Sequence, residues 1–145
     1  MVVDSNVALK WVLAEQDSPI AQALFDEWTQ SGTLLLAPDL FVYETTKVLF
    51  RNTLVAGLSM SDARDGVVHL LTLGIDLIPI SGSDLSLRAM EFAERFHLPA
   101  TYDPHYLALA EREGCEFWTA DERLWNSVKA DLPWVRWLGE HVATP

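Results

Sequence analysis

Four acidic residues are the part of this sequence best suited to chemistry. Asp4 and Asp121 directly follow short apolar runs, and Asp103 stands at the start of a predicted helix. Glu44 lies on the apolar stripe of another predicted helix. A carboxylate in such surroundings is costly to bury unless another group satisfies its charge. The types and positions of these residues therefore suggest a shared carboxylate site.

Carboxylates gathered in one small cleft point to a divalent cation. Like charges at close range cannot all stay ionised unless a cation lies beside them. Carboxylate oxygens select Mg²⁺ or Mn²⁺ over zinc, and the four histidines and single cysteine show no ligand spacing. A site of this kind activates water and stabilises displacement at a phosphodiester. We expect catalysis and metal binding by the same four residues, Asp4, Glu44, Asp103 and Asp121.

Each acid also has a purely structural interpretation. Aspartate is a favoured helix N-cap, and the proline after Asp103 strengthens that signal. Asp39 follows a proline at a helix start, and we assign it capping alone. Glu44 could pair with Lys47 one helical turn on. Three aspartates at element boundaries together with one inward glutamate favour a site over four unrelated caps and pairs.

The elements that must position these acids alternate along the chain. Alternating helical patterns and short apolar runs predict an α/β domain with a parallel sheet of four to five strands. We expect strands at 1–3, 75–80, 116–119 and 134–137, with 34–37 a strand or a helix lead-in. Helices on both faces would place ligands outside the carboxyl ends of the strands.

The helix starts are predicted from capping patterns. A first helix is expected at 7–13, and Ser18, Ser61 and Ser83 are expected to cap three further helices, the first of which ends at Gly32. Other helices are predicted from Asp39 to about residue 54, over 103–113 and from Asp121. The helix after Ser83 is expected to pack against the core through one face, which consists of Ala89, Met90, Ala93 and Phe96.

Length and composition indicate one globular domain over residues 1–145. Half of the residues are hydrophobic, and no apolar run approaches the length of a membrane span. The first residues lack a basic segment before an apolar stretch, so we expect no signal peptide. Cys115 is the single cysteine, which excludes an intrachain disulfide. A cytoplasmic location and no membrane association are therefore expected.

The net charge of -11 is unusual for a protein that binds nucleic acid. Phosphate contacts dominate such binding and normally require a basic surface. Bound cations and a few local basic residues would have to supply the attraction. We would test Lys10, Lys47, Arg51 and Arg88 first for RNA contact. The acidity also suits a basic protein partner.

Four segments carry a resemblance to a known family. They are VVDSNVAL at 2–9, APDLFVYE at 37–44, YDPHYLALAE at 102–111 and TADERL at 119–124. In this order they resemble the PIN-domain family, and within it the VapC toxins of bacterial toxin–antitoxin pairs. The sequence departs from the family at Lys47, where asparagine is frequent, and at Pro104-His105, where small or apolar residues are usual.

The resemblance implies a compact three-layer α/β/α fold and Mg²⁺- or Mn²⁺-dependent endoribonuclease activity. It also implies a homodimer and a cognate antitoxin that blocks the site. Asp4, Asp103 and Asp121 would coordinate the cation, and Glu44 would bind a second cation or orient the attacking water. Ser5, Asn6 and Thr119 would hydrogen-bond the carboxylates.

Three other functions remain possible at this point. A non-catalytic receiver module would need adjacent acids after the first strand, but Ser5 and Asn6 follow Asp4. A phosphatase with an aspartyl nucleophile would need a second acid two residues after Asp4, where Asn6 stands. A PIN-like scaffold that only binds a partner fits the same segments without catalysis.

Overall fold

A central sheet of five parallel strands organises the protein. The computed structural model describes residues 1–82 and 84–141, and within them the strand order is β3-β2-β1-β4-β5. The strands are β1 (Val2–Val3), β2 (Leu36–Pro38), β3 (Asp76–Ile78), β4 (Phe117–Thr119) and β5 (Val135–Trp137). All four strand pairs are parallel, which confirms the predicted sheet and makes 34–37 part of a strand.

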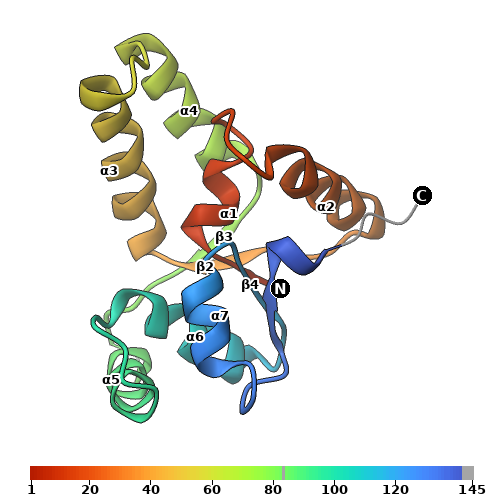
Figure 1. Cartoon of the computed structure of the whole chain (residues 1–145), viewed down its shortest axis with the longest axis vertical. Coiled ribbons are helices and arrows are strands. Elements are labelled where there is room, and N and C mark those ends of the chain that lie inside the picture. Colours follow the sequence, from red (N-terminus) through yellow and green to blue (C-terminus); the bar gives the residue numbers. More distant parts are fainter. Residues whose placement is uncertain (83, 142–145) are drawn as a thin grey trace.

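Helices cover both faces of the sheet (Figure 1). One layer holds α1 (Ser5–Leu9), α2 (Ser18–Ser31), α3 (Leu40–Val55) and α4 (Met60–Thr72). The other holds α5 (Leu85–Arg95), α6 (Tyr102–Glu113) and α7 (Glu122–Val128), and a short 3-10 helix, η1 (Leu138–Glu140), follows β5. The predicted three-layer α/β/α fold is therefore confirmed. None of the described helices has both the length and the apolar character needed to cross a membrane.

The strand order reverses direction at β1, and this reversal positions the site. From β1 the chain builds outward through β2 and β3, and it then returns to place β4 on the other side of β1. In open parallel sheets, ligands bind outside the carboxyl ends of the strands at such a switch point. The residues that follow β1 and β4 are Asp4 and the segment that leads to Asp121.

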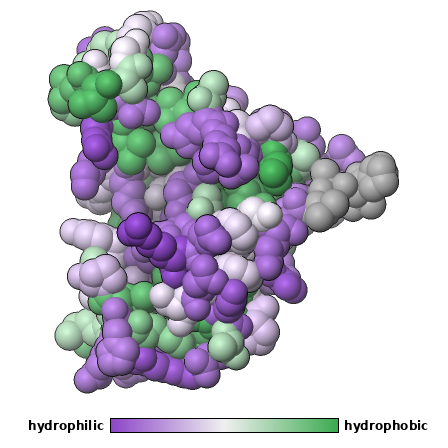
Figure 2. All heavy atoms as spheres, viewed as in Figure 1, coloured by the Kyte–Doolittle hydropathy of each residue, from purple (hydrophilic) through white to green (hydrophobic). Residues whose placement is uncertain are grey.

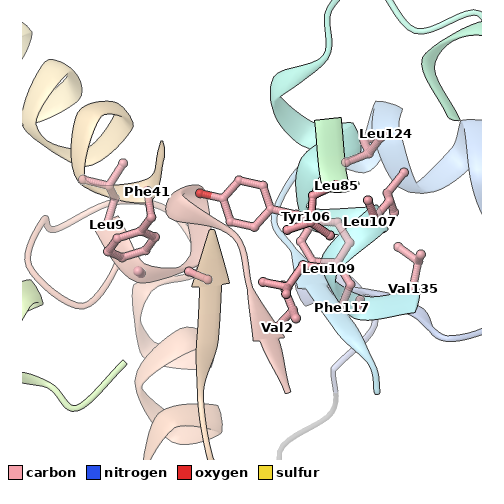
Figure 3. Close-up of a cluster of buried hydrophobic side chains, with 14 of the residues drawn as sticks. Val2, Leu9, Phe41, Leu85, Tyr106, Leu107, Leu109, Phe117, Leu124 and Val135 are labelled. Atoms are coloured by element: carbon pink, nitrogen blue, oxygen red, sulfur yellow. The ribbon is translucent and has the colours of Figure 1, made fainter. Parts of the chain in front are cut away.

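The core lies between the sheet and its helices. The strand residues Val2, Val3 and Phe117 are fully buried, as are Tyr106 and Leu107 of α6. Figure 3 shows side chains of α6 packed against strand side chains, with the Tyr106 ring extending toward the α1 and α3 side of the molecule. Burial on both faces explains why these strands read as continuous apolar runs.

Several helix starts differ from the capping predictions. Ser18 is the first residue of α2, and its Oγ donates to Leu13 O (2.8 Å) and accepts from Glu15 N (3.0 Å), so it does not cap the helix. The cap of α4 is Ser59, whose Oγ accepts from Asp62 N at 2.9 Å, so the assignment to Ser61 was wrong. Local patterns cannot separate serines two residues apart, because both fit the capping rule.

Other boundaries were also only partly predicted. The first helix spans Ser5–Leu9 and not 7–13, since it begins as soon as β1 ends. Gly32 ends α2 with a positive φ of 67°, as expected. The predicted cap Ser83 lies outside the described residues. In α5, Ala89 is fully buried and Ala93 and Phe96 are partly buried, as predicted, but Met90 is 61% exposed and Phe92, at 1% exposed, takes its place on the inward face.

Asp39 has a different role from the one predicted. It precedes α3, but its side chain makes no capping hydrogen bond. Its Oδ1 accepts from Ile80 N at 3.3 Å, and its own N–H donates to Ile78 O at 2.9 Å. These two hydrogen bonds hold the start of α3 against the end of β3.

The helices α3 and α4 form an arm that projects from the sheet (Figure 1). They pack closely because Gly66 of α4 leaves room for Leu49, whose methyl groups would lie 3.3 Å from an added Cβ. Apolar side chains are exposed on the arm, and Figure 2 shows hydrophobic residues gathered at its tip. Those exposed are Tyr43, Phe50, Leu54, Val55, Met60, Val68 and Leu71.

Candidate active site

Asp4 is held at the end of β1 by hydrogen bonds from β4 and from the start of α1. It is 1% exposed, and its N–H donates to Trp118 O of β4 at 2.9 Å. Thr119 Oγ1 donates to Asp4 Oδ2 at 2.7 Å, and Ser5 Oγ donates to Oδ1 at 3.4 Å. The Asp4 carboxylate is therefore both buried and held in one orientation.

A small polar network surrounds this carboxylate. Thr119 Oγ1 accepts from Asp121 N at 3.0 Å and from Asn6 Nδ2 at 3.4 Å. Asn6 Oδ1 in turn accepts from Ala120 N at 2.8 Å. Thr119 and Ser5 thus contact Asp4 directly, as expected, while Asn6 acts through Thr119. The network joins the carboxyl ends of β1 and β4 at the switch point of the sheet.

Glu44 reaches the same region from α3. It is half-buried, and its Oε1 accepts a hydrogen bond from the hydroxyl of Tyr106 at 2.8 Å. The Tyr106 ring is fully buried and stacks on Phe117, with 5.7 Å between the ring centroids. Sequence reasoning missed Tyr106 as a site residue. The available signal was its place one helical turn after Asp103, since a buried tyrosine hydroxyl usually needs a partner.

The alternative interpretation of Glu44, an ion pair with Lys47, is not observed, since no salt bridge joins them in the described structure. Burial raises the pKa of Glu44, and the charge of Asp103 raises it further. The hydrogen bond from Tyr106 and the more distant charge of Lys47 act against this increase. Glu44 therefore holds its proton more tightly than an exposed glutamate.

Asp103 lies in the first turn of α6 and not at its N-cap, because Thr101 precedes the helix. Its carboxylate accepts no hydrogen bond from any residue that the structure describes. Burial raises the pKa of Asp103, and the nearby charge of Asp121 raises it further. Asp103 is thus a partly buried carboxylate that lacks a stabilising partner within the described chain.

Asp121 caps α7, as its position predicted. Its Oδ1 accepts from Arg123 N at 2.8 Å and from Leu124 N at 3.1 Å. Both bonds use the same oxygen, so Oδ2 stays available to another ligand. Asp121 and Asp103 also line the same surface hollow.

Mutual repulsion connects the four acids. Burial raises the pKa of Asp4 well above its ordinary value, and the charges of Asp103 and Glu44 raise it further despite the Thr119 hydrogen bond. The charge of Asp121 in turn raises the pKa of Asp103. The fold therefore brings Asp4, Glu44 and Asp103 together, with Asp121 joined to them through Asp103.

The donor set suits a hard divalent cation. Among residues 1–82 and 84–141, no three carboxylate, imidazole or thiol groups are close enough to form a ready-made metal cage. Mg²⁺ does not require such a cage, since it commonly binds one or two carboxylates and keeps several waters. The partnerless carboxylate of Asp103 and the buried charge of Asp4 therefore fit a hydrated Mg²⁺ or Mn²⁺.

Two of the basic residues first considered for RNA contact are already engaged. Lys10 pairs with Glu15 at 3.3 Å. Arg88 forms a bidentate salt bridge with Glu111, with N–O distances of 2.7 and 2.8 Å, and a second salt bridge with Glu91. These contacts restrain both side chains, which makes them weaker candidates for phosphate binding.

Comparison with known proteins agrees with this geometry. The sequence pattern of the PIN domain matches residues 1–130, and no curated protein is significantly similar to the chain. PIN domains are generally nucleases and usually use divalent metals. The match favours this family over the receiver and phosphatase alternatives. Because it covers most of the sequence, the chain belongs to the PIN-domain family.

Proposed function

We propose that the protein is a Mg²⁺- or Mn²⁺-dependent endoribonuclease. The observation that carries this proposal is the environment of Asp4. Its carboxylate is almost fully buried at the switch point of the sheet, next to Glu44 and Asp103. No Lys or Arg forms an ion pair with it within the described chain. A divalent cation would supply the missing positive charge.

The four acids have distinct roles in this proposal. Asp4, Asp103 and Asp121 hold the cation, directly or through water, while Glu44 holds a second cation or orients the attacking water. Tyr106 donates to Oε1 of Glu44, and the Ser5 side chain also interacts with this carboxylate, so both restrain its orientation. Thr119 fixes the orientation of Asp4. The bound cation supplies a more acidic water and offsets charge on the leaving oxygen.

Cleavage of RNA with and without the cation tests the proposal. Purified protein should cut a long single-stranded RNA in Mg²⁺ or Mn²⁺ and stop when EDTA is added. Asp4→Asn should reduce the rate by at least about a hundredfold, since it removes a charge from the metal site. Asp65→Asn, an exposed acid on α4, is the matched control and should retain full activity. Absence of metal-dependent cleavage of any RNA would favour the scaffold alternative.

We further propose that this nuclease is the toxin of a VapBC-type pair and acts in the cytoplasm as a homodimer, one domain of residues 1–145 per subunit. The resemblance to VapC toxins supports this proposal, and so does the apolar surface of the α3–α4 arm. An apolar patch of this kind commonly marks a protein-binding surface. The net charge of -11 suits a basic antitoxin that blocks the active site.

Substitution of Leu54 tests the role of this arm. Leu54→Glu should convert a dimer into a monomer, or abolish antitoxin binding, as measured by light scattering and co-purification. Leu87→Glu, an equally exposed leucine on α5, should change neither property. A wild-type monomer that also fails to bind the protein encoded by an adjacent short reading frame would exclude both partners.

A further inference from the structure

A surface hollow opens beside the candidate active site, on the α6–α7 side. Its volume is about 270 Å³, and Asp103 and Asp121 form part of its lining. The segment 97–100, which precedes α6, forms one wall, and residues of α7 form the other. We call it the Arg123 hollow, because Arg123 is the one arginine or lysine among the residues that line it; His97 also lines it.

Arg123 is one of the Lys and Arg residues that form no ion pair within the described chain, together with Lys47, Arg51, Arg64 and Lys129. Lys10, Arg88, Arg95, Arg112 and Arg136 all form ion pairs with acids. Arg123 is exposed, and its guanidinium forms no ion pair with any described residue. A free guanidinium next to two metal-site candidates is the local positive charge that a protein of net charge -11 needs to hold phosphate.

The remaining walls suit a nucleobase better than a second phosphate. Leu98, Pro99 and Leu124 supply apolar surface, and Ser127 adds a hydroxyl on α7. Single-stranded RNA is recognised mainly through unstacked bases that stack on aromatic side chains or on the plane of an arginine guanidinium, while the backbone meets basic side chains. In this hollow the Arg123 guanidinium and the apolar side chains would receive the base. A duplex would keep its bases stacked and out of reach of the hollow.

We propose that the Arg123 hollow binds the nucleotide next to the scissile phosphate of single-stranded RNA. Arg123 contacts that nucleotide's phosphate, and its base lies between the 97–100 segment and α7. This inference rests on the proposed ribonuclease function and adds a binding residue to it.

Binding of a short RNA tests the hollow separately from catalysis. In the Asp4→Asn background, fluorescence anisotropy would report the Kd of a labelled oligouridylate and oligoadenylate over a range of salt concentrations. Arg123→Gln should raise the Kd by about tenfold and lower the slope of log Kd against log salt by about 0.7, the value for one lost phosphate contact on a single strand. Arg64→Gln, an exposed arginine on α4, should leave both unchanged.

A second variant tests whether the base enters the hollow. Ser127→Trp should fill it, raise the Kd by at least about fivefold because the base can no longer enter, and shift the preference between the two oligonucleotides. In otherwise wild-type protein, both variants should raise KM for cleavage more than they lower kcat.

Three outcomes would overturn the inference. If Arg123→Gln behaves like Arg64→Gln while the wild type cleaves RNA, the hollow is not a subsite and the proposed function stands. If Arg123→Gln weakens binding but Ser127→Trp does not, the RNA contacts Arg123 outside the hollow. If the wild type cleaves no RNA, the proposed function fails and the inference fails with it.

Discussion

The hydroxyl of Tyr106 donates a hydrogen bond to Glu44 Oε1 at 2.8 Å, although the two residues are 62 positions apart. Tyr106 belongs to α6 and Glu44 to α3, which lie in different helical layers (Figure 1). The contact therefore couples the acid of α3 to the helix that carries Asp103. It also restrains the rotation of the Glu44 carboxylate.

Removal of this hydroxyl should affect turnover more than substrate binding. Tyr106→Phe keeps the ring that stacks on Phe117 but leaves Glu44 free to rotate. We expect kcat to fall by about tenfold through loss of positioning, with KM within about twofold of the wild type. The Tm should fall by about 2–4 °C, in line with one lost hydrogen bond.

Tyr43→Phe is the matched control for this measurement, because Tyr43 also lies on α3 and is 78% exposed. It should leave both kcat and Tm unchanged. A Tyr106→Phe enzyme with wild-type kcat would show that Glu44 needs no positioning by this hydroxyl.

Thr119 should control how well the cation is held. Its hydroxyl donates to Asp4 Oδ2 at 2.7 Å and accepts from Asp121 N at 3.0 Å. Thr119→Val keeps the shape but loses these bonds and the one accepted from Asn6 Nδ2, so metal affinity should fall by about 10- to 100-fold, as for other residues that support a ligand. Thr119→Ser keeps the hydroxyl and should stay close to the wild type. Calorimetric titration with Mn²⁺ separates the two variants, and equal affinities would contradict the role.

The buried acids should make the metal-free protein less stable as pH rises. Asp4, Glu44 and Asp103 all have a raised pKa in the fold, caused first by burial. Between their ordinary and raised pKa values, the folded state binds more protons than the unfolded state, so the free energy of unfolding decreases with pH. In EDTA, the Tm should therefore be higher near about pH 5 than near about pH 8.

Asp4→Asn should remove much of this dependence, since it replaces the most buried of the charges. At the higher pH and without metal, its Tm should exceed that of the wild type by about 2–6 °C, because an unpaired buried charge is lost. The control Asp65→Asn should retain the wild-type profile. A wild-type Tm that rises with pH in EDTA would contradict the assignment of repelling carboxylates.

The parts of the site that depend on local pattern were predictable. Asp4 and Asp121 follow apolar runs, and the rule that parallel strands share one carboxyl edge places both at the same edge of the sheet. Glu44 was identifiable because its charge conflicts with the apolar stripe of its helix. Each of these inferences uses only the residue type and its immediate neighbours.

The parts that depend on distant partners were not predictable. The sequence predicts that Asp39 caps α3. In the fold, its carboxylate instead accepts a hydrogen bond from Ile80 N. Tyr106 reads as a core aromatic, and nothing near it in the sequence identifies Glu44 as its acceptor. A polar side chain often has several possible hydrogen-bond partners, and packing between elements determines which one it binds. The local sequence does not contain that information.

Two substitutions of Asp121 can distinguish its role as a helix cap from its proposed role as a metal ligand. Its Oδ1 accepts two backbone N–H groups at the start of α7, while Oδ2 is available to a cation. Asparagine is as good a cap as aspartate but carries no charge. Asp121→Asn should therefore retain the wild-type Tm in EDTA within about 2 °C, and Asp121→Ala should lose about 1 kcal/mol of stability. Both variants should bind Mn²⁺ at least about tenfold more weakly than the wild type if the carboxylate is a ligand. If Asp121→Asn keeps full Mn²⁺ affinity and cleavage while Asp121→Ala loses only stability, Asp121 serves as a cap alone.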